Sequence, residues 1–212
     1  MIKKIILFNR VILTMAVVDF FVNGALGVIG PFFAIFITQQ IKGGDAAVVG
    51  FATASYWVVK SVFQLPIARF LDKTDGKSDE FWAFFCGYIA TALVPILYYL
   101  SSAPWHLYLV QAGFGFAMAW AVPAWYSIFT THLDAHKIAF EWSLVSVISV
   151  GASASIAAAL GGLLIKNYGF NMIFIIASLV IFLSALAVLS IKDGIVTKKA
   201  ILDKNTAGLP IK

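Results

Sequence analysis

Six long apolar stretches decide what this chain can fold into. About 20 apolar residues in a helix cross the ~30 Å hydrocarbon core of a bilayer. Hydrophobic residues make up 61% of the 212 residues and charged residues only 12%, about half the charge of a soluble domain. This composition excludes an ordinary soluble enzyme, a disordered chain and a nucleic-acid-binding module. We predict spans over Val11–Thr38, Ala46–Leu71, Phe81–Leu100, Trp105–Thr130, Ala139–Ile165 and Gly169–Ile191.

The expected fold is an all-α, multi-pass protein of the cytoplasmic (inner) membrane. The alternating ten-residue segments of a β-barrel are absent, and a helix satisfies its own backbone in lipid. Twelve of the fifteen lysines and arginines fall before the first span or after the second, fourth and sixth, and only Lys42 and Lys166 lie in the opposite loops. Basic loops face the cytoplasm. We therefore predict cytoplasmic termini, a bundle over residues 1–191 and a cytoplasmic tail over 192–212.

The first and fourth spans share a glycine-rich pattern that ends in proline. Gly27 and Gly30 precede Pro31 in the first span, and a similar run precedes Pro123 in the fourth. We expect each proline to break its helix at a similar point. Spans separated by three crossings run in opposite directions. The pattern favours two inverted three-helix repeats, about 11–100 and 105–191, which is a known sign of transporter folds. The alternative is that glycine and proline are common in membrane helices of every kind.

Two ionisable residues lie deep within spans, Asp19 in the first and Lys60 in the second. Each costs about 2.5–3.5 kcal/mol at the bilayer centre, so such residues are functional by default. Their similar depths would allow an ion pair that only locks two helices together. On helical spacing they lie on two polar stripes, formed by Asp19, Asn23, Gly27 and Gly30, and by Thr53, Tyr56, Lys60 and Gln64. We expect a water-accessible cavity in which Asp19 takes up a proton or faces a cation.

Two further groups of residues have a packing interpretation beside a functional one. Gln111 and the aromatic residues Trp57, Trp120, Trp125 and Tyr126 would suit an amphipathic ligand pocket, although aromatic residues more often simply pack. In the fifth span, small residues recur every four positions and predict a close helix interface. These are Gly151, Ser155 and Ala159, and also Ser153, Ala157 and Gly161.

The loop after the second span carries the most specific local pattern. It reads Ala68-Arg-Phe-Leu-Asp72-Lys73-Thr-Asp-Gly76-Lys77, an acid at a helix end followed by a tight basic turn. Such a loop can act as a gate by exchanging ion pairs as helices rock. The pattern resembles the signature between the second and third helices of the major facilitator superfamily. Asp72 and Lys73 match its acid and base, whereas Ala68 replaces its first glycine, and Gly76 and Lys77 match after one extra residue.

A second stretch, Ala159-Leu-Gly161-Gly162 followed by Tyr168-Gly169-Phe170, is also similar to that family. The family's antiporter motif has Gly-Pro before the paired glycines where this chain has Ala157-Ala158, so antiport does not follow. The resemblance covers the chain as one half of a twelve-helix protein. It implies that the first and fourth helices line a central cavity and that the second and fifth meet the other half. We therefore expect a homodimer or a separately encoded six-helix partner.

The resulting hypothesis is a secondary transporter of a small molecule, in which Asp19 is the candidate site of proton coupling. The alternatives are a non-transporting assembly protein that contains an Asp19–Lys60 ion pair and, less favoured, a membrane-embedded enzyme. His132, His136, Asp134 and Glu141 would suit a metal only on a common helix, and we expect solvated loop histidines instead. No phosphate loop, serine elbow or zinc-protease motif occurs. No cofactor, metal or nucleic-acid partner is expected.

Overall fold

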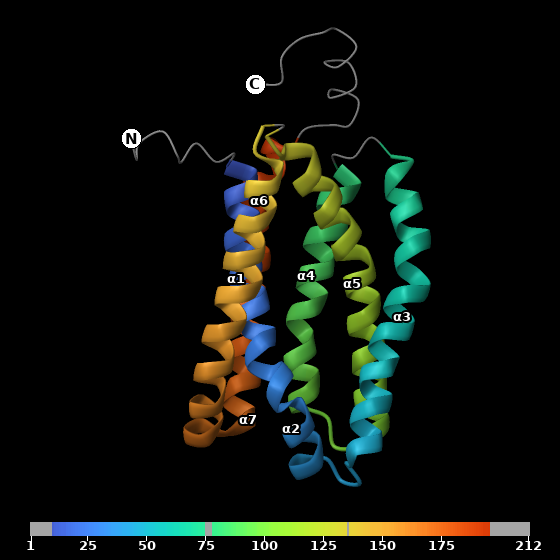
Figure 1. Ribbon diagram of the computed structural model, residues 1–212. Coiled ribbons are helices and arrows are strands. Elements are labelled where there is room, and N and C mark those ends of the chain that lie inside the picture. Colours follow the sequence, from blue (N-terminus) through green and yellow to red (C-terminus); the bar gives the residue numbers. More distant parts are fainter. Residues whose placement is uncertain (1–9, 75–77, 135, 196–212) are drawn as a thin grey trace, which may run out of the picture.

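The computed structural model describes residues 10–74, 78–134 and 136–195, and every regular element within these ranges is a helix (Figure 1). The helices differ in type. Short 3-10 turns occur at η2 and η4, and η3 is a π-helix. The elements are α1 (Arg10–Ile29), η2 (Gly30–Phe32), α2 (Phe33–Gln40), α3 (Ala46–Asp72), α4 (Ser78–Tyr99), α5 (Pro104–His132), α6 (Ile138–Val145), η3 (Ser146–Ala152), α7 (Ser153–Val188) and η4 (Leu189–Gly194).

Five helical stretches of the described residues are long and apolar enough to cross a membrane. They are Arg10–Gln40, Ala46–Asp72, Ser78–Tyr99, Pro104–His132 and Ile138–Gly194. The first four agree with the predicted spans to within a few residues. The last contains 57 residues, which at 1.5 Å per residue is about 85 Å of helix. That is far more than one straight crossing needs.

A break at Gly169 divides this last stretch. Its backbone takes φ 76° and ψ 172°, a left-handed conformation that glycine adopts without steric cost. The helix reverses there, and α7 consists of two arms that run side by side (Figure 1). Ile156 and Leu160 of the first arm line the same cavity as Ile173 and Ile176 of the second. The residues of the predicted fifth span lie in α6, η3 and the first arm, and those of the predicted sixth span lie in the second arm and η4.

Small residues set the contacts between helices. α1 packs against α7, α3 against α5, and α4 against both α5 and α7. A Cβ built at Gly115 would lie 2.4 Å from the carbonyl oxygen of Tyr56, and one at Gly27 would lie 3.1 Å from the Cβ of Ala157. These glycines allow backbones to approach as closely as they do. The predicted close interface of the fifth span is thus found between Ala157 of α7 and α1.

Two features of the spans differ from the sequence interpretation. Pro31 lies in the 3-10 turn η2 and breaks the first span, as expected, but α5 continues as an α-helix through Pro123. The expected second break is therefore wrong, since membrane helices accommodate a proline when local adjustments satisfy the freed carbonyl. Sequence analysis also missed the π-helical turns of η3. There the Ser149 hydroxyl donates to the Ala16 carbonyl oxygen at 2.9 Å and ties η3 to α1.

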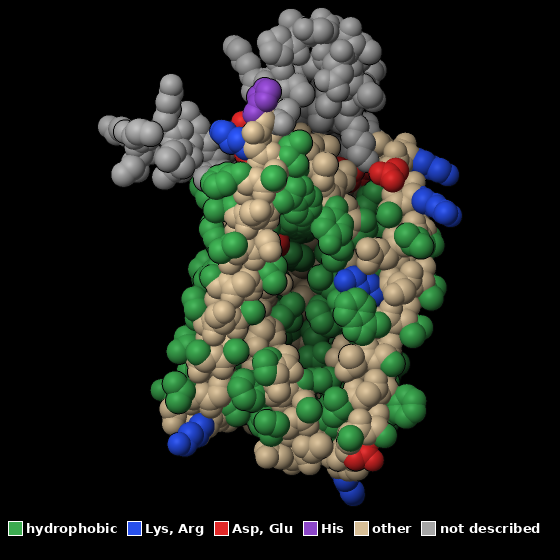
Figure 2. All heavy atoms as spheres, viewed as in Figure 1, with side chains coloured by type: hydrophobic (Ala, Val, Ile, Leu, Met, Phe, Trp, Pro, Cys, Tyr) green, Lys and Arg blue, Asp and Glu red, His purple; other side chains and the backbone are tan. Residues whose placement is uncertain are grey.

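Hydrophobic side chains cover most of the surface visible in Figure 2, and charged groups gather mainly at its two ends. Large apolar residues of α3 are among the most exposed, including Phe51 at 66% and Leu65 at 67%. A surface of this kind is stable in contact with lipid and not with water. Between the α7 side and the α3 side, this face of the molecule is hollowed (Figures 1 and 2).

Candidate functional site

Asp19 lies near the middle of α1 and is buried, with 7% of its surface exposed. It follows the first residue of α1 by nine positions, which is about 14 Å along the axis. The Tyr88 hydroxyl of α4, itself buried, donates a hydrogen bond of 2.6 Å to Asp19 Oδ1. This short contact joins α1 to α4 at mid-depth. Tyr88 was not predicted as a site residue. A tyrosine within an apolar span, whose hydroxyl needs a hydrogen-bond partner, is the sequence signal that could have identified it.

Lys60 lies at a comparable depth in α3, twelve residues before its last residue, or about 18 Å. Its side chain is half-buried, and Nζ lies 5.1 Å from the ring centroid of Trp57 and 5.5 Å from that of Tyr56. Aromatic faces attract an ammonium at such distances. The Tyr56 ring in turn lies 4.8 Å from that of Phe114 in α5.

Asp19 and Lys60 do not form an ion pair. Neither side chain takes part in the ion pair that is found between Lys137 and Asp134 at 3.3 Å. The alternative of a structural Asp19–Lys60 pair is therefore wrong, because Tyr88 donates to Asp19 and the Lys60 ammonium lies beside two aromatic rings. Comparable depth did not imply contact, since α1 packs against α7 and α3 packs against α5.

The other polar residues of the predicted site follow the same two helices and α5. Asn23 lies one turn beyond Asp19 and Gln64 one turn beyond Lys60, and both are half-buried. Gln111 of α5 is buried at 8% exposure, one turn before Gly115, where α3 and α5 approach closely. The structure thus joins α3 to α5 around Tyr56 and Lys60, and joins α1 to α4 around Asp19.

The predicted aromatic residues lie in different places. Trp120 lines a groove between α3 and α4, and its ring lies 6.2 Å from that of Phe70. Trp125 instead stacks on Phe129 at 4.8 Å and contacts Trp142 of α6, and its indole N–H is buried without an acceptor. Trp57 and Tyr126 are more than half and about half exposed, at 55% and 50%. The structure does not place Trp120 and Trp125 around one common cavity.

The predicted gating loop is described only in part. Asp72 is the last residue of α3 and Lys73 its C-cap, and both are exposed. The Thr74 hydroxyl donates to the Leu71 carbonyl oxygen at 2.7 Å. Gly76 and Lys77 lie outside the described residues.

The predicted packing residues divide into two sets. Gly161 faces α1 and η2, since a Cβ there would lie 3.3 Å from the Val28 carbonyl oxygen of α1 and 3.0 Å from the Phe32 ring of η2, and Gly162 lies beside the same ring. Gly151 and Ser155 are exposed instead, with the Ser155 hydroxyl donating to the Gly151 carbonyl oxygen. Gly30 and Pro31 are also exposed, and a Cβ at Gly30 would meet no atom within 4 Å. One small-residue face is therefore used within the chain and a second is free for a further contact.

Two buried glutamates were not predicted as part of the site. Glu80, at 1% exposure, accepts a 2.6 Å hydrogen bond from the Ser127 hydroxyl. Glu141, at 3% exposure, accepts one from the Asp134 backbone N–H at 2.9 Å. Both glutamates lie in the first turn of a helix, α4 or α6, where the positive end of the helix dipole favours a negative charge. This position at a helix start is the sequence signal that could have identified them.

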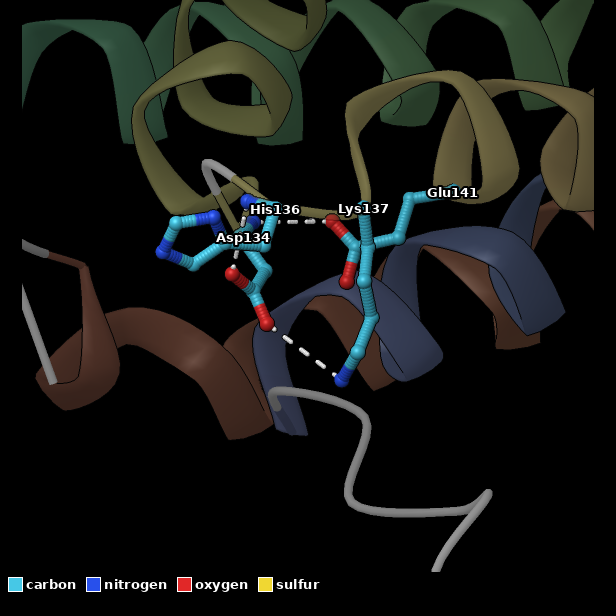
Figure 3. A network of polar contacts seen from close by, with 4 residues as sticks. All are labelled: Asp134, His136, Lys137 and Glu141. Atoms are coloured by element: carbon cyan, nitrogen blue, oxygen red, sulfur yellow. Dashed lines mark hydrogen bonds and ion pairs between the residues drawn. The ribbon is translucent and has the colours of Figure 1, made fainter.

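The connection between α5 and α6 is held by its own polar groups (Figure 3). The His136 backbone N–H donates to Asp134 Oδ1 at 3.0 Å, and Lys137 pairs with Oδ2. The hydrogen bond from His136 lowers the pKa of the Asp134 carboxyl, and Lys137 adds to the effect. His132 Nδ1 lies 2.7 Å from the Ile128 carbonyl oxygen. Within the described residues, no three His, Cys, Asp or Glu side chains gather as metal ligands.

A family model described as Major Facilitator Superfamily matches residues 14–210. The chain belongs to the major facilitator superfamily. Members of this superfamily are membrane transporters rather than enzymes. The matched residues include both of the stretches that resemble the family in sequence. No curated protein and no solved structure matches the chain.

Proposed function

We propose that the chain is one bundle of a secondary active transporter that carries a small molecule across the cytoplasmic membrane by alternating access. Two such bundles would rock against each other, and proton uptake by Asp19 would drive the cycle. The observation that carries the proposal is the Asp19 carboxylate itself. It lies at mid-depth in a membrane helix, and its hydrogen-bond partner is the neutral Tyr88 hydroxyl rather than a cation.

A carboxylate in this position suits reversible proton uptake. An intramembrane acid costs several kcal/mol in its charged form, and no ion pair within the described residues offsets that cost. Asp19 can instead change its charge by binding a proton while it keeps the hydrogen bond to Tyr88. A change of charge at mid-depth alters the relative stability of two bundle arrangements, which is what coupling requires.

Lys60 supplies a second charge within a membrane helix, α3. Its ammonium is half-buried beside Tyr56 and Trp57, so part of its surface remains available to a ligand. We propose that Lys60, with Gln64 on the next turn, contacts the substrate, and that Asn23 lies beside the proton site on α1. An aromatic wall with a few convergent polar groups is the usual composition of a small-molecule site.

The proposed topology has six membrane crossings in two inverted repeats, and the bundle begins and ends on the cytoplasmic side. The contacts support it. In such repeats the first span corresponds to the fourth and the second span to the fifth. The contact of α1, in the first span, with the first arm of α7, in the fifth, then corresponds to the contact of α5, in the fourth, with α3, in the second. Both contacts are made at glycines, Gly27 and Gly115. The basic loops favour the cytoplasmic orientation.

The second bundle would be a second copy of the chain or a related six-helix half. The exposed small residues Gly151 and Ser155 support a close helix contact with it. A two-fold dimer would use the same surface of both copies. The substitution Gly151→Leu is then expected to prevent dimerisation in mild detergent, measured by native mass spectrometry, while Gly113→Leu on exposed α5 surface leaves the dimer intact.

The alternative of a non-transporting assembly protein depended on an Asp19–Lys60 ion pair, and that pair is absent from the structure. A transport assay distinguishes the two functions. Proteoliposomes containing the full chain and an internal pH dye are supplied with a panel of sugars, amino acids, nucleosides and organic ions. We expect at least one compound to move protons with the native chain and with Asp193→Asn, an exposed terminal acid, but not with Asp19→Asn. Proton movement by folded Asp19→Asn equal to that of the native chain would refute the coupling role.

A further inference from the structure

A second candidate site lies away from Asp19 and Lys60, in an open groove bounded by α3, α4 and α5. Its volume is about 490 Å³, within the usual range for small-molecule sites. Asp79, in the first turn of α4, lies at one end, and Ala90 lies eleven residues further along that helix, or about 16 Å. The groove thus extends from the end of the span towards its middle.

Aromatic rings form most of the groove surface that faces outwards. Phe70 is 53% exposed, Trp82 42% and Phe116 43%, and the Trp120 ring lies 6.2 Å from that of Phe70. Small residues of α4 and α5, such as Gly87, provide the depth. An opening lined in this way is accessible from the lipid and suits a flat or chain-like apolar body.

One polar group points to the chemistry of the ligand. Asp79 Oδ2 is buried and has no hydrogen-bond partner, and none of the described lysines or arginines forms an ion pair with it. Leaving a buried acceptor unpaired costs about 1–3 kcal/mol, and more when the group is charged. The neighbouring Glu80, by contrast, accepts a hydrogen bond from Ser127. The groove therefore presents one unsatisfied acceptor at the end of an apolar surface.

We propose that this groove binds an amphipathic amine, with its ammonium on Asp79 and its apolar body against the aromatic rings. An ammonium supplies both the charge and the donors that Asp79 lacks, and aromatic faces add attraction for a cation. An anion would be repelled by Asp79, and a neutral apolar chain would leave it unpaired.

The chain's single cysteine provides a reporter, because Cys86 is exposed and lines the groove. The full chain is placed in nanodiscs of phosphatidylcholine, and the rate of Cys86 alkylation by N-ethylmaleimide is measured. The probes are 4,4-diphenylbutylamine and the corresponding alcohol and carboxylate. We expect the amine to slow alkylation at least about fivefold at saturation, and the other two to slow it less than twofold.

Variants test the two halves of the site separately. Asp79→Asn is expected to abolish protection by the amine, whereas Asp193→Asn, an exposed acid in η4, retains it. Ala90→Phe fills the groove, leaves Asp79 in place and is also expected to abolish protection, which keeps the test decisive if Asp79→Asn does not fold. Equal protection by amine and alcohol would overturn the proposal and assign the groove to lipid chains. Undiminished protection in folded Asp79→Asn or Ala90→Phe would also overturn it.

Discussion

The hydrogen bond between Tyr88 and Asp19 predicts a measurable coupling between the two side chains. Tyr88→Phe removes the hydroxyl and leaves Asp19 Oδ1 buried without that donor. A hydrogen bond to a charged group contributes about 1.5–3 kcal/mol, and one between neutral groups about 0.5–1.5 kcal/mol. Tyr88→Phe is therefore expected to destabilise the native chain by about 1.5–3 kcal/mol, and to destabilise the Asp19→Asn variant by about 1 kcal/mol less.

The assay is a double-mutant cycle on the free energy of unfolding in one detergent at neutral pH. Phe81→Leu serves as a control, since it alters a buried ring of the same helix about two turns from Tyr88 that makes no hydrogen bond to Asp19. The control substitution should lower the free energy of unfolding by the same amount whether residue 19 is Asp or Asn. Additive effects of Tyr88→Phe and Asp19→Asn, within about 0.3–0.5 kcal/mol, would refute the inference that the two side chains meet.

Three other substitutions test the packing and the loop. Gly115→Leu should destabilise the bundle by about 1–3 kcal/mol or prevent folding, because a side chain there meets the α3 backbone; Gly113→Leu, where a Cβ meets no atom within 4 Å, should cost little in the same thermal assay. Ser149→Ala should cost about 1 kcal/mol in unfolding free energy, since it removes the hydrogen bond that ties η3 to α1; an unchanged value would count against that contact. Because the pKa of Asp134 is lowered in the folded chain, its carboxylate stabilises the fold at pH values above the unfolded pKa, and this stabilisation is lost as the pH falls through the folded pKa. Melting temperatures measured below pH 5 should therefore fall less for Asp134→Asn than for the native chain. An identical fall for both would contradict the prediction.

The predictable part of the fold followed from hydropathy and helix spacing. The first four spans were predicted to within three residues at each end, because a bilayer fixes how many apolar residues a helix needs. The interface at Ala157 and Gly161 followed from small-residue spacing. The contact partners of Asp19 and Lys60 could not be predicted from the sequence. The position of a residue along its span gives its depth in the membrane, but not which neighbouring helix its side chain faces. Only the placement of α1 and α4 within the folded bundle brings Tyr88 to Asp19.

Other features depend on contacts that a single sequence does not encode locally. The π-helical turns of η3 contain ordinary residues, and nothing in their spacing distinguishes them from an α-helix. Pro123 matches Pro31 in sequence, but only the latter follows a glycine at the end of a helix and breaks it. The groove beside Asp79 likewise requires three helices to be placed before its volume exists.

The most direct test of alternating access uses Asn23→Cys in a Cys86→Ala background. Asn23 lies one helical turn from Asp19 and is half-buried, so the substitution keeps the proposed proton site. Vesicles of each orientation are treated with a membrane-impermeant maleimide, and labelling of the full chain is quantified. The account predicts labelling from both sides of the membrane. Labelling from one side only, or from neither side, in a folded protein would contradict it.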